Sequence, residues 1–278
     1  MIQLGMVQTL RIVKKVEFGV YLSDGSGEES RVLLPQKQVP NQTQTGDELE
    51  VFVYRDSKDR LIATTHMPKI TLHGVAKVRV AQVGKVGAFL DWGLEKDLLL
   101  PYKEQTRRVA EGEECLVALY IDKSDRLCAT MNVYPYLSAD SPYKKEDRVS
   151  GTVYEISDNF GAFVAVDDKY SGLIPKKELY GNVHIGDKIQ ARVTGVKEDG
   201  KLNLSIREKA YLQIDEDARK VMDIIYSFDG VLPFTDKASP EVIKRETQMS
   251  KNEFKRAVGR LLKEGKIQIT ERAIRAIE

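Results

Sequence analysis

The chain has 278 residues, of which 42% are hydrophobic, and its 43 basic and 42 acidic side chains leave a formal net charge of +1. This balance excludes a uniformly basic surface, so an anionic partner has to be met by local patches. No run approaches the ~18 apolar residues of a membrane span. In the start MIQLGMVQTLRIVKK the positive charges follow a short apolar stretch, whereas in a signal peptide they precede a longer one. These features predict a cytoplasmic protein without a membrane partner.

Three segments of the chain repeat one phrase at fixed spacings. They read FGVYLSDGSGEESRVLLP (18–35), VGAFLDWGLEKDLLLP (86–101) and FGAFVAVDDKYSGLIP (160–175). From the glycine of the phrase to the closing proline there are 14 residues in the second and third segments, and 16 in the first, whose SDGSGEES turn is longer. From each proline there are 11 residues to the glycine that opens the following alternating run (Gly46, Gly112 or Gly186). Spacings that coincide in this way indicate a repeated structural unit.

Each repeat continues with an alternating run, a charged turn and a second run. These parts read GDELEVFVYRDSKDRLIAT, GEECLVALYIDKSDRLCAT and GDKIQARVTGVKEDGKLNLSI. Period-two alternation around such a turn is typical of a hairpin of half-buried strands. Each unit is therefore predicted to hold five short strands, as in a small closed barrel of the OB type. The linkers THMPKI and NVYPYLSADSPYKKED place the predicted barrels at 1–67, 68–138 and 143–209.

The last part of the chain, 211–278, changes from the period of strands to that of helices. Apolar residues at helical spacing predict a first helix over 211–228. Ser239 followed by Pro240 predicts the start of a second helix, because serine is a good N-cap and proline fits the first helical position.

A third helix and a hairpin follow. Ser250 and Glu253 have the spacing of a capping box, and Gly265 is placed to end the helix. The alternating segment KIQITERAIRAIE then predicts a terminal hairpin. Three helices followed by a hairpin are the pattern of a winged helix. The predicted fold is thus mainly β, with three tandem five-stranded barrels and a C-terminal α+β unit.

The third predicted helix is the most basic part of this unit. Between Ser250 and Lys266 there are six basic and two acidic residues. The candidate nucleic-acid face comprises Lys251, Lys255, Arg256 and Arg260. Such a face suits phosphate groups, but a solvated helix face or a protein interaction surface has the same pattern, so both interpretations remain open.

The repeats resemble the ribosomal S-one domain, an OB-fold RNA-binding unit, and the third repeat is the most similar. It has a GTV opening, FGAFV, GLI, the GD before the fourth strand and a closing LSIR. Three such units followed by a winged helix are similar to the bacterial conserved virulence factor B family, whose members are described as RNA-binding regulatory proteins. The resemblance implies single-stranded RNA as the partner and a role in post-transcriptional or virulence-related gene regulation.

The resemblance also implies an RNA-binding face on each barrel, made of two aromatic residues around the FGAF phrase and charged residues near the final hairpin. The corresponding positions are Phe160, Phe163, Lys197 and Lys201 in the third barrel, Phe89, Asp122 and Arg126 in the second, and Phe18, Tyr21, Asp56 and Arg60 in the first. Val86 replaces the first aromatic residue of the second barrel. Where the family has a histidine, all three units have a proline (Pro35, Pro101 and Pro175). The third and first barrels are therefore expected to bind better than the second.

Aromatic and basic residues together suit a single strand, because rings stack on bases and cations meet phosphates. Strict alternation places Phe160 and Phe163 on opposite faces of a strand, so a bulge at Gly161 is expected to bring both rings to one face. In the alternative interpretation one or both rings close the barrel core. Trp92 is expected to pack in the interior.

Catalytic and cofactor sites have no visible pattern in the sequence. The three histidines, His66, His73 and His184, lie in different parts of the repeats, and there is no GxxxxGK[ST] or GxGxxG motif. Cys115 and Cys128 lack metal-ligand spacing and are expected to be reduced, buried thiols. We therefore expect a protein that is not an enzyme and that uses no cofactor, metal or small-molecule substrate. A competing interpretation is a protein adaptor that docks on a ribosome or RNA-processing complex with little RNA contact.

Overall fold

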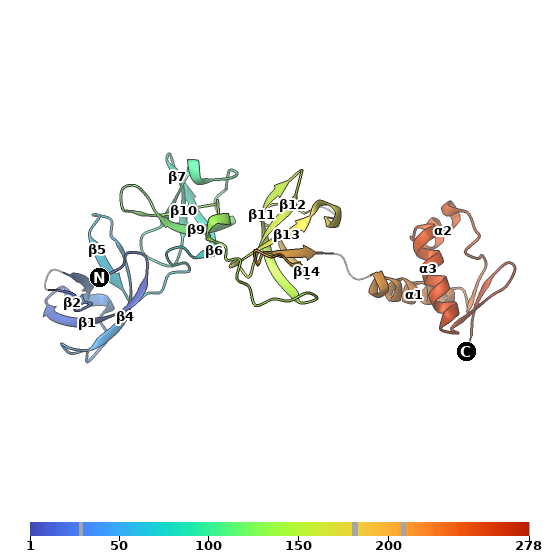
Figure 1. The fold of residues 1–278 in the computed structure, drawn as a ribbon, viewed down its shortest axis with the longest axis horizontal. Coiled ribbons are helices and arrows are strands. Elements are labelled where there is room, and N and C mark those ends of the chain that lie inside the picture. Colours follow the sequence, from blue (N-terminus) through green and yellow to red (C-terminus); the bar gives the residue numbers. More distant parts are fainter. Residues whose placement is uncertain (28–29, 180–182, 207–209, 278) are drawn as a thin grey trace. The chain divides into compact units, whose positions relative to one another are not determined.

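The computed structural model describes residues 1–27, 30–179, 183–206 and 210–277, which divide into two compact units, Met1–Ile206 and Arg207–Glu278. The first unit holds three closed barrels, and the second holds helices with a small sheet (Figure 1). This confirms the predicted fold class. Two predicted features lie outside the described residues: part of the SDGSGEES turn (28–29) and the predicted end of the third barrel (209). The predicted limits of the barrels stay predictions. Within the described ranges, no helix has the length and apolar character needed to cross a membrane.

The three barrels share one strand order. In each of them the first strand pairs with the second and the fourth, and the third strand runs parallel beside the fifth, which closes the barrel. The strands are β1 (Val7–Val16), β2 (Gly19–Ser23), β3 (Arg31–Pro35), β4 (Glu48–Arg55) and β5 (Leu61–Thr64) in the first barrel; β6 (Val75–Val83), β7 (Gly87–Asp91), β8 (Leu98–Pro101), β9 (Glu114–Ile121) and β10 (Leu127–Thr130) in the second; and β11 (Arg148–Ser157), β12 (Gly161–Val166), β13 (Tyr170–Pro175), β14 (Lys188–Val196) and β15 (Leu202–Ser205) in the third.

The glycine and proline of each repeat face one another across two strands. In the third barrel Gly161 pairs with Pro175, has φ +117°, and would place a Cβ atom 2.1 Å from the carbonyl oxygen of Ile174. The equivalent pairs are Gly19 with Pro35 and Gly87 with Pro101, and a Cβ there would lie 2.1 and 2.2 Å from a carbonyl oxygen. Only glycine fits so close to a neighbouring backbone. This contact explains why the spacing from glycine to proline recurs.

The expected bulge at Gly161 is wrong. The register of the β11–β12 pair shifts between Val153 and Glu155, so the extra residue belongs to β11 and is Tyr154. The first two barrels have the same irregularity in β1 and β6. Phe160 lies in the turn before β12 and not in the strand. Strand alternation therefore does not apply to the Phe160 and Phe163 pair.

The barrel interiors are filled by aliphatic residues, and Trp92 joins the first two barrels. Trp92 is 3% exposed, and its ring centroid lies 5.6 Å from that of Phe52 in β4. The predicted packing role of Trp92 is thus confirmed. Cys115 and Cys128 are free and buried, as predicted, and burial raises the pKa of each thiol to about 11.

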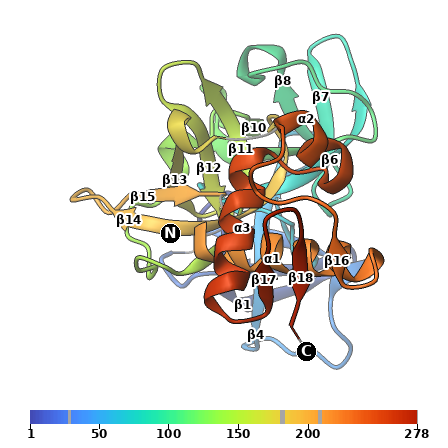
Figure 2. The same cartoon turned by 90° about the vertical axis from the view of Figure 1, so that its right-hand side faces the viewer.

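The C-terminal unit contains the predicted helices and hairpin and one strand more. Its elements are α1 (Ala210–Ser227), β16 (Val231–Leu232), α2 (Pro240–Thr247), α3 (Lys251–Lys263), β17 (Ile267–Ile269) and β18 (Ile274–Ala276). The two-residue strand β16 pairs with β18 and completes a three-stranded sheet. Ser239 caps α2, and Ser250 and Glu253 form the capping box of α3. Figure 2 shows α3 beside β17, which pairs with β18.

Candidate nucleic-acid interface

The third barrel carries a surface cavity that contains all four of its predicted site residues. The cavity has a volume of about 260 Å³. It is lined by Tyr134, Phe160, Phe163, Ser171, Gly172, Leu173, Lys197 and Lys201. The turn before β12, the strands β12 and β13, and the β14–β15 hairpin thus converge on one apolar hollow with two lysines. We call this hollow the third-barrel cavity.

Two phenyl rings form the aromatic part of the third-barrel cavity. Phe160 is 63% exposed, and its ring centroid lies 6.4 Å from that of Phe163, with the planes inclined by 60°. Phe163 is half-buried and lies 6.2 Å from the ring of Tyr154, the residue of the β11 bulge. Phe160 therefore takes no part in the barrel core, whereas Phe163 both packs on the barrel and lines its surface.

The β14–β15 hairpin supplies the cations. The amide of Lys197 donates a hydrogen bond to the carbonyl of Lys201, which fixes the turn between them. The Lys201 ammonium lies 2.8 Å from Asp199 Oδ2, and this contact lowers the pKa of Asp199 and raises that of Lys201. Lys197 is exposed. Lys197 thus presents its charge to solvent, while Lys201 already shares its charge with a neighbouring carboxylate.

Tyr134 is a member of the third-barrel cavity that the sequence did not single out. It opens the short 3-10 helix η3 (Tyr134–Tyr136) in the linker before the third barrel. The Lys201 ammonium lies 5.7 Å from the centroid of its ring. Its signal in the sequence is an aromatic residue within the linker NVYPYL, a segment whose composition indicates only a domain boundary.

The first barrel repeats the aromatic pair. Phe18 is 58% exposed, and its ring centroid lies 6.5 Å from that of Tyr21 in an edge-to-face arrangement. In the β4–β5 hairpin, Arg60 donates from Nε and Nη2 to Asp56 Oδ2 at 2.9 and 2.7 Å. Partial burial raises the pKa of Asp56, but the hydrogen bonds from Arg60 and Lys58 outweigh burial and lower the pKa overall. Arg60 is thus held by the turn.

The second barrel has different side chains at the equivalent positions, and the first barrel lies beside them. Val86, in the place of Phe160, is 60% exposed, and Phe89 is half-buried. Phe89, Asp122 and Arg126 do come together, in a cavity of about 200 Å³. Tyr54 and Arg55 of β4 line the same cavity, so the first barrel takes part in this face.

The basic side chains at this face form ion pairs and hydrogen bonds between the first and second barrels. Arg126 forms an ion pair with Asp59 of the β4–β5 hairpin. Arg55 Nε donates to the carbonyl oxygen of Asp125 at 2.9 Å, and Lys96 Nζ donates to that of Asp56 at 3.1 Å. The predicted face of the second barrel is therefore in contact with the first barrel at Arg126.

The strand register shows that the three faces are equivalent. Each aromatic residue of the second strand pairs with a leucine of the third strand, and that leucine pairs with a residue of the fifth strand. These sets are Tyr21, Leu33 and Ile62; Phe89, Leu99 and Cys128; and Phe163, Leu173 and Asn203. The basic residue two positions before the last member is Arg60, Arg126 or Lys201. The barrels thus differ in side chains and neighbours rather than in register.

The prolines at the family's histidine position end the third strand of each barrel. Pro35, Pro101 and Pro175 each precede a 3-10 turn, η1 (Gln36–Gln38), η2 (Tyr102–Glu104) or η4 (Lys176–Glu178). The first amide of each turn donates to the carbonyl of the residue before the paired glycine, as Lys176 does to Phe160 at 3.0 Å. The residue after each proline thus holds the position of Phe18, Val86 or Phe160.

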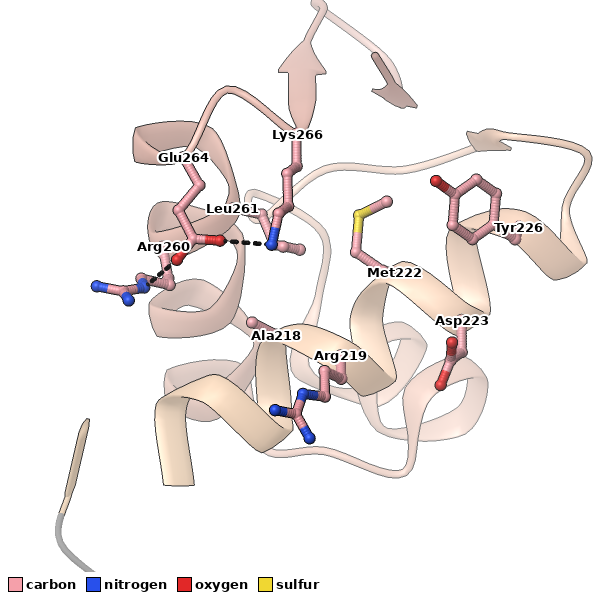
Figure 3. Close-up of a pocket in the computed structure, with 9 residues that line it drawn as sticks. All are labelled: Ala218, Arg219, Met222, Asp223, Tyr226, Arg260, Leu261, Glu264 and Lys266. Atoms are coloured by element: carbon pink, nitrogen blue, oxygen red, sulfur yellow. Dashed lines mark ion pairs between the residues drawn. The ribbon is translucent and has the colours of Figure 1, made fainter. Parts of the chain in front are cut away.

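The winged-helix unit places its four predicted basic residues along α3. Lys255, Arg256 and Arg260 are exposed, and Lys251 is half-buried. Glu264 accepts from Arg260 at 2.5 Å and from Lys266 at 2.9 Å, as Figure 3 shows. These three residues border a hollow of about 410 Å³ between α1 and α3, which is also lined by Ala218, Arg219, Met222, Asp223, Tyr226 and Leu261. The charge of Arg260 is thus shared with Glu264, whereas Lys255 and Arg256 point to solvent on the described helix.

Comparisons with known families cover most of the chain. Residues 4–66 and 75–132 match the family model "S1 domain", residues 137–208 match "Virulence regulatory factor CvfB, second domain", and residues 219–275 match "CvfB-like winged helix domain". These matches confirm the barrel and winged-helix assignments.

Curated relatives match nearly the whole length of the chain. The chain is 29% identical to "Conserved virulence factor B" of Staphylococcus saprophyticus over 99% of this chain and 97% of the relative. It is 32% identical to "Uncharacterized protein YitL" of Bacillus subtilis over 95% and 90%, respectively. A crystal structure of a multidomain protein with nucleic acid binding domains from Streptococcus pneumoniae is 26% identical over 99% of this chain and 98% of that chain, with a TM-score of 0.49. The chain belongs to the conserved virulence factor B family.

Proposed function

We propose that this protein binds single-stranded RNA through its barrels and acts as a post-transcriptional regulator of gene expression. The observation that carries the proposal is the third-barrel cavity, in which the exposed ring of Phe160 lies beside Phe163 and two lysines. Stacking on such rings is worth about 1 to 3 kcal/mol per base and does not depend on sequence. Lys197 and Lys201 would meet the phosphates. The role is binding rather than catalysis.

The barrels are proposed to contribute unequally. The third barrel is the principal site, and the first barrel, with Phe18, Tyr21 and Arg60, is the second. The second barrel contributes least, because Val86 offers no ring and Arg126 is paired with Asp59. Lys255 and Arg256 of α3 are proposed as an additional phosphate-binding face.

The test is a titration of the whole protein with labelled oligo(U), oligo(A) and a duplex at several salt concentrations. In the double variant Phe160→Ala, Phe163→Ala we expect binding of the single strands to weaken by about 2 kcal/mol or more, close to 30-fold, because two stacking surfaces are lost. Val86→Ala is the matched control, since it truncates an equally exposed residue at the equivalent position of the second barrel. Circular dichroism and thermal unfolding check that the fold is intact.

Three outcomes would contradict the proposal. Unchanged affinity in the double variant would exclude the third-barrel cavity as the site. Negligible affinity of the unchanged protein for every single strand would favour the adaptor that docks on other proteins. Metal-dependent cleavage of the oligonucleotide would favour an enzyme.

Binding should also weaken as salt rises. The logarithm of the binding constant should fall with the logarithm of the salt concentration, with a slope of roughly −0.7 for each phosphate contacted.

A further inference from the structure

The linker before the third barrel contributes a side chain to the third-barrel cavity. Tyr134 belongs to neither neighbouring family match, because these end at residue 132 and begin at residue 137. It nevertheless lines the third-barrel cavity together with Phe160 and Phe163. A residue outside both family matches is thus part of a surface that we proposed for RNA.

The backbone of the linker is held in place around Tyr134. The residue before it, Val133, is fully buried, and the ring of Tyr136 lies 6.1 Å from that of His73. The amide of Leu137 donates to the carbonyl of Tyr134 at 3.2 Å, closing the 3-10 turn. Pro135 further restricts the conformation of Tyr134. The tyrosine is therefore displayed from a fixed turn.

The same linker is attached to the strand that lines the cavity. The amide of Ser138 donates to the carbonyl of Lys169 at 2.8 Å, and the amide of Ser171 donates to the carbonyl of Ser138 at 2.9 Å. Ser138 thus forms an isolated bridge with Tyr170 in β13. Because Ser171 itself lines the third-barrel cavity, the linker and the cavity are parts of one local structure.

The ring of Tyr134 is exposed despite this ordered backbone. It is 45% exposed, and its polar neighbour is the ammonium of Lys201, 5.7 Å from the ring centroid. An aromatic ring beside a cation and two further rings has the composition of a stacking platform for single-stranded nucleic acid. A preorganised ring also loses little conformational entropy when a base stacks on it.

We propose that the third-barrel cavity is a composite nucleobase site to which the linker supplies a third stacking ring, Tyr134. The ligand is single-stranded RNA, with a base against Tyr134, Phe160 or Phe163 and its phosphates near Lys197 and Lys201. This inference rests on the proposed function of the third barrel. It goes further because it assigns RNA binding to a linker residue and extends the site beyond the barrel.

The experiment measures binding of labelled oligo(U) to the whole protein and to three variants of Tyr134. In Tyr134→Ala we expect a loss of about tenfold, the cost of one stack. Tyr134→Leu, which keeps apolar bulk without a ring, should lose as much, while Tyr134→Phe should stay within about twofold. Asn132→Ala is the matched control, since Asn132 is an exposed residue of the same linker that does not line the cavity.

Adding Tyr134→Ala to the Phe160→Ala, Phe163→Ala variant should cost much less than in the unchanged protein, because rings of one site act together. The inference alone is overturned if Tyr134→Ala or Tyr134→Leu binds like Asn132→Ala while the double phenylalanine variant is weakened. If the phenylalanine variant also binds normally, or the unchanged protein binds no single strand, the proposed function fails together with this inference. Thermal unfolding of the leucine variant separates a lost ring from a disturbed linker.

Discussion

The second and third barrels share strand order, register and a glycine–proline contact, yet their equivalent faces differ in what surrounds them. In the third barrel, Phe160, Phe163 and a linker tyrosine surround an open hollow. In the second, Val86 takes the first position and Arg126 is paired with the first barrel. Equivalent strands thus carry a candidate RNA surface in one unit and contact the neighbouring barrel in the other. The position of a residue in the repeat therefore does not determine its use.

The largest expected effect comes from a substitution that destabilises the third barrel. Gly161→Ala would place a Cβ atom 2.1 Å from Ile174 O at φ +117°, so we expect the free energy of unfolding of that barrel to fall by about 3 kcal/mol. Gly195→Ala is the matched control in the same barrel, because a Cβ there meets no heavy atom within 4 Å. Urea unfolding measures both variants. Equal midpoints for the two would show that the glycine–proline contact is not needed.

A second variant makes the second barrel resemble the third. Val86→Phe would place a ring at a position that is 60% exposed and three residues before Phe89, the spacing of Phe160 and Phe163 in the third barrel. We expect oligo(U) to bind about 1 kcal/mol more tightly, the lower end of the stacking range, because Arg126 is already engaged. Val86→Leu adds apolar bulk without a ring and serves as the control. If both variants bind alike, the missing ring is not what distinguishes the second barrel.

The smallest expected effect concerns Arg126, the basic residue of the second barrel that pairs with Asp59. Asp59→Asn removes the charge of an exposed ion pair with Arg126 and keeps a residue type that tolerates φ +60°, so the free energy of unfolding should change by less than about 0.5 kcal/mol. If the freed guanidinium meets one more phosphate, the salt dependence of RNA binding should steepen by roughly 0.7. Adding Arg126→Ala should remove that gain. A slope that is the same in all three proteins would mean that Arg126 lies outside the path of the RNA.

The barrels and the aromatic pairs could be predicted from the sequence because each depends on residues that are close along the chain. The glycine–proline spacing follows from one contact between neighbouring strands, and the capping box of α3 is a pattern of four residues. The position of Phe160 beside Phe163 was also expected, although for the wrong reason. The bulge lies in the partner strand at Tyr154, and alternation along β12 carries no information about it.

Other features depend on contacts that leave no local pattern. The pairing of Arg126 with Asp59 joins two ordinary turn residues of different barrels. Strand β16 has two residues, too few for a period to be recognised. Tyr134 has no counterpart inside the repeat phrase, so comparing the repeats could not identify it. The second barrel was expected to be the weaker binder, but from Val86 alone and not from the barrel beside it.

The attachment of the linker to β13 bears on how this protein can be divided for study or recombined with others. A fragment that starts at residue 143, the predicted beginning of the third barrel, would keep every strand of that barrel. It would lack both Ser138, which bridges to Tyr170, and Tyr134, which lines the cavity. A fragment that starts at Asn132 keeps both. A fragment intended to retain the proposed RNA site thus has to be longer than the predicted barrel.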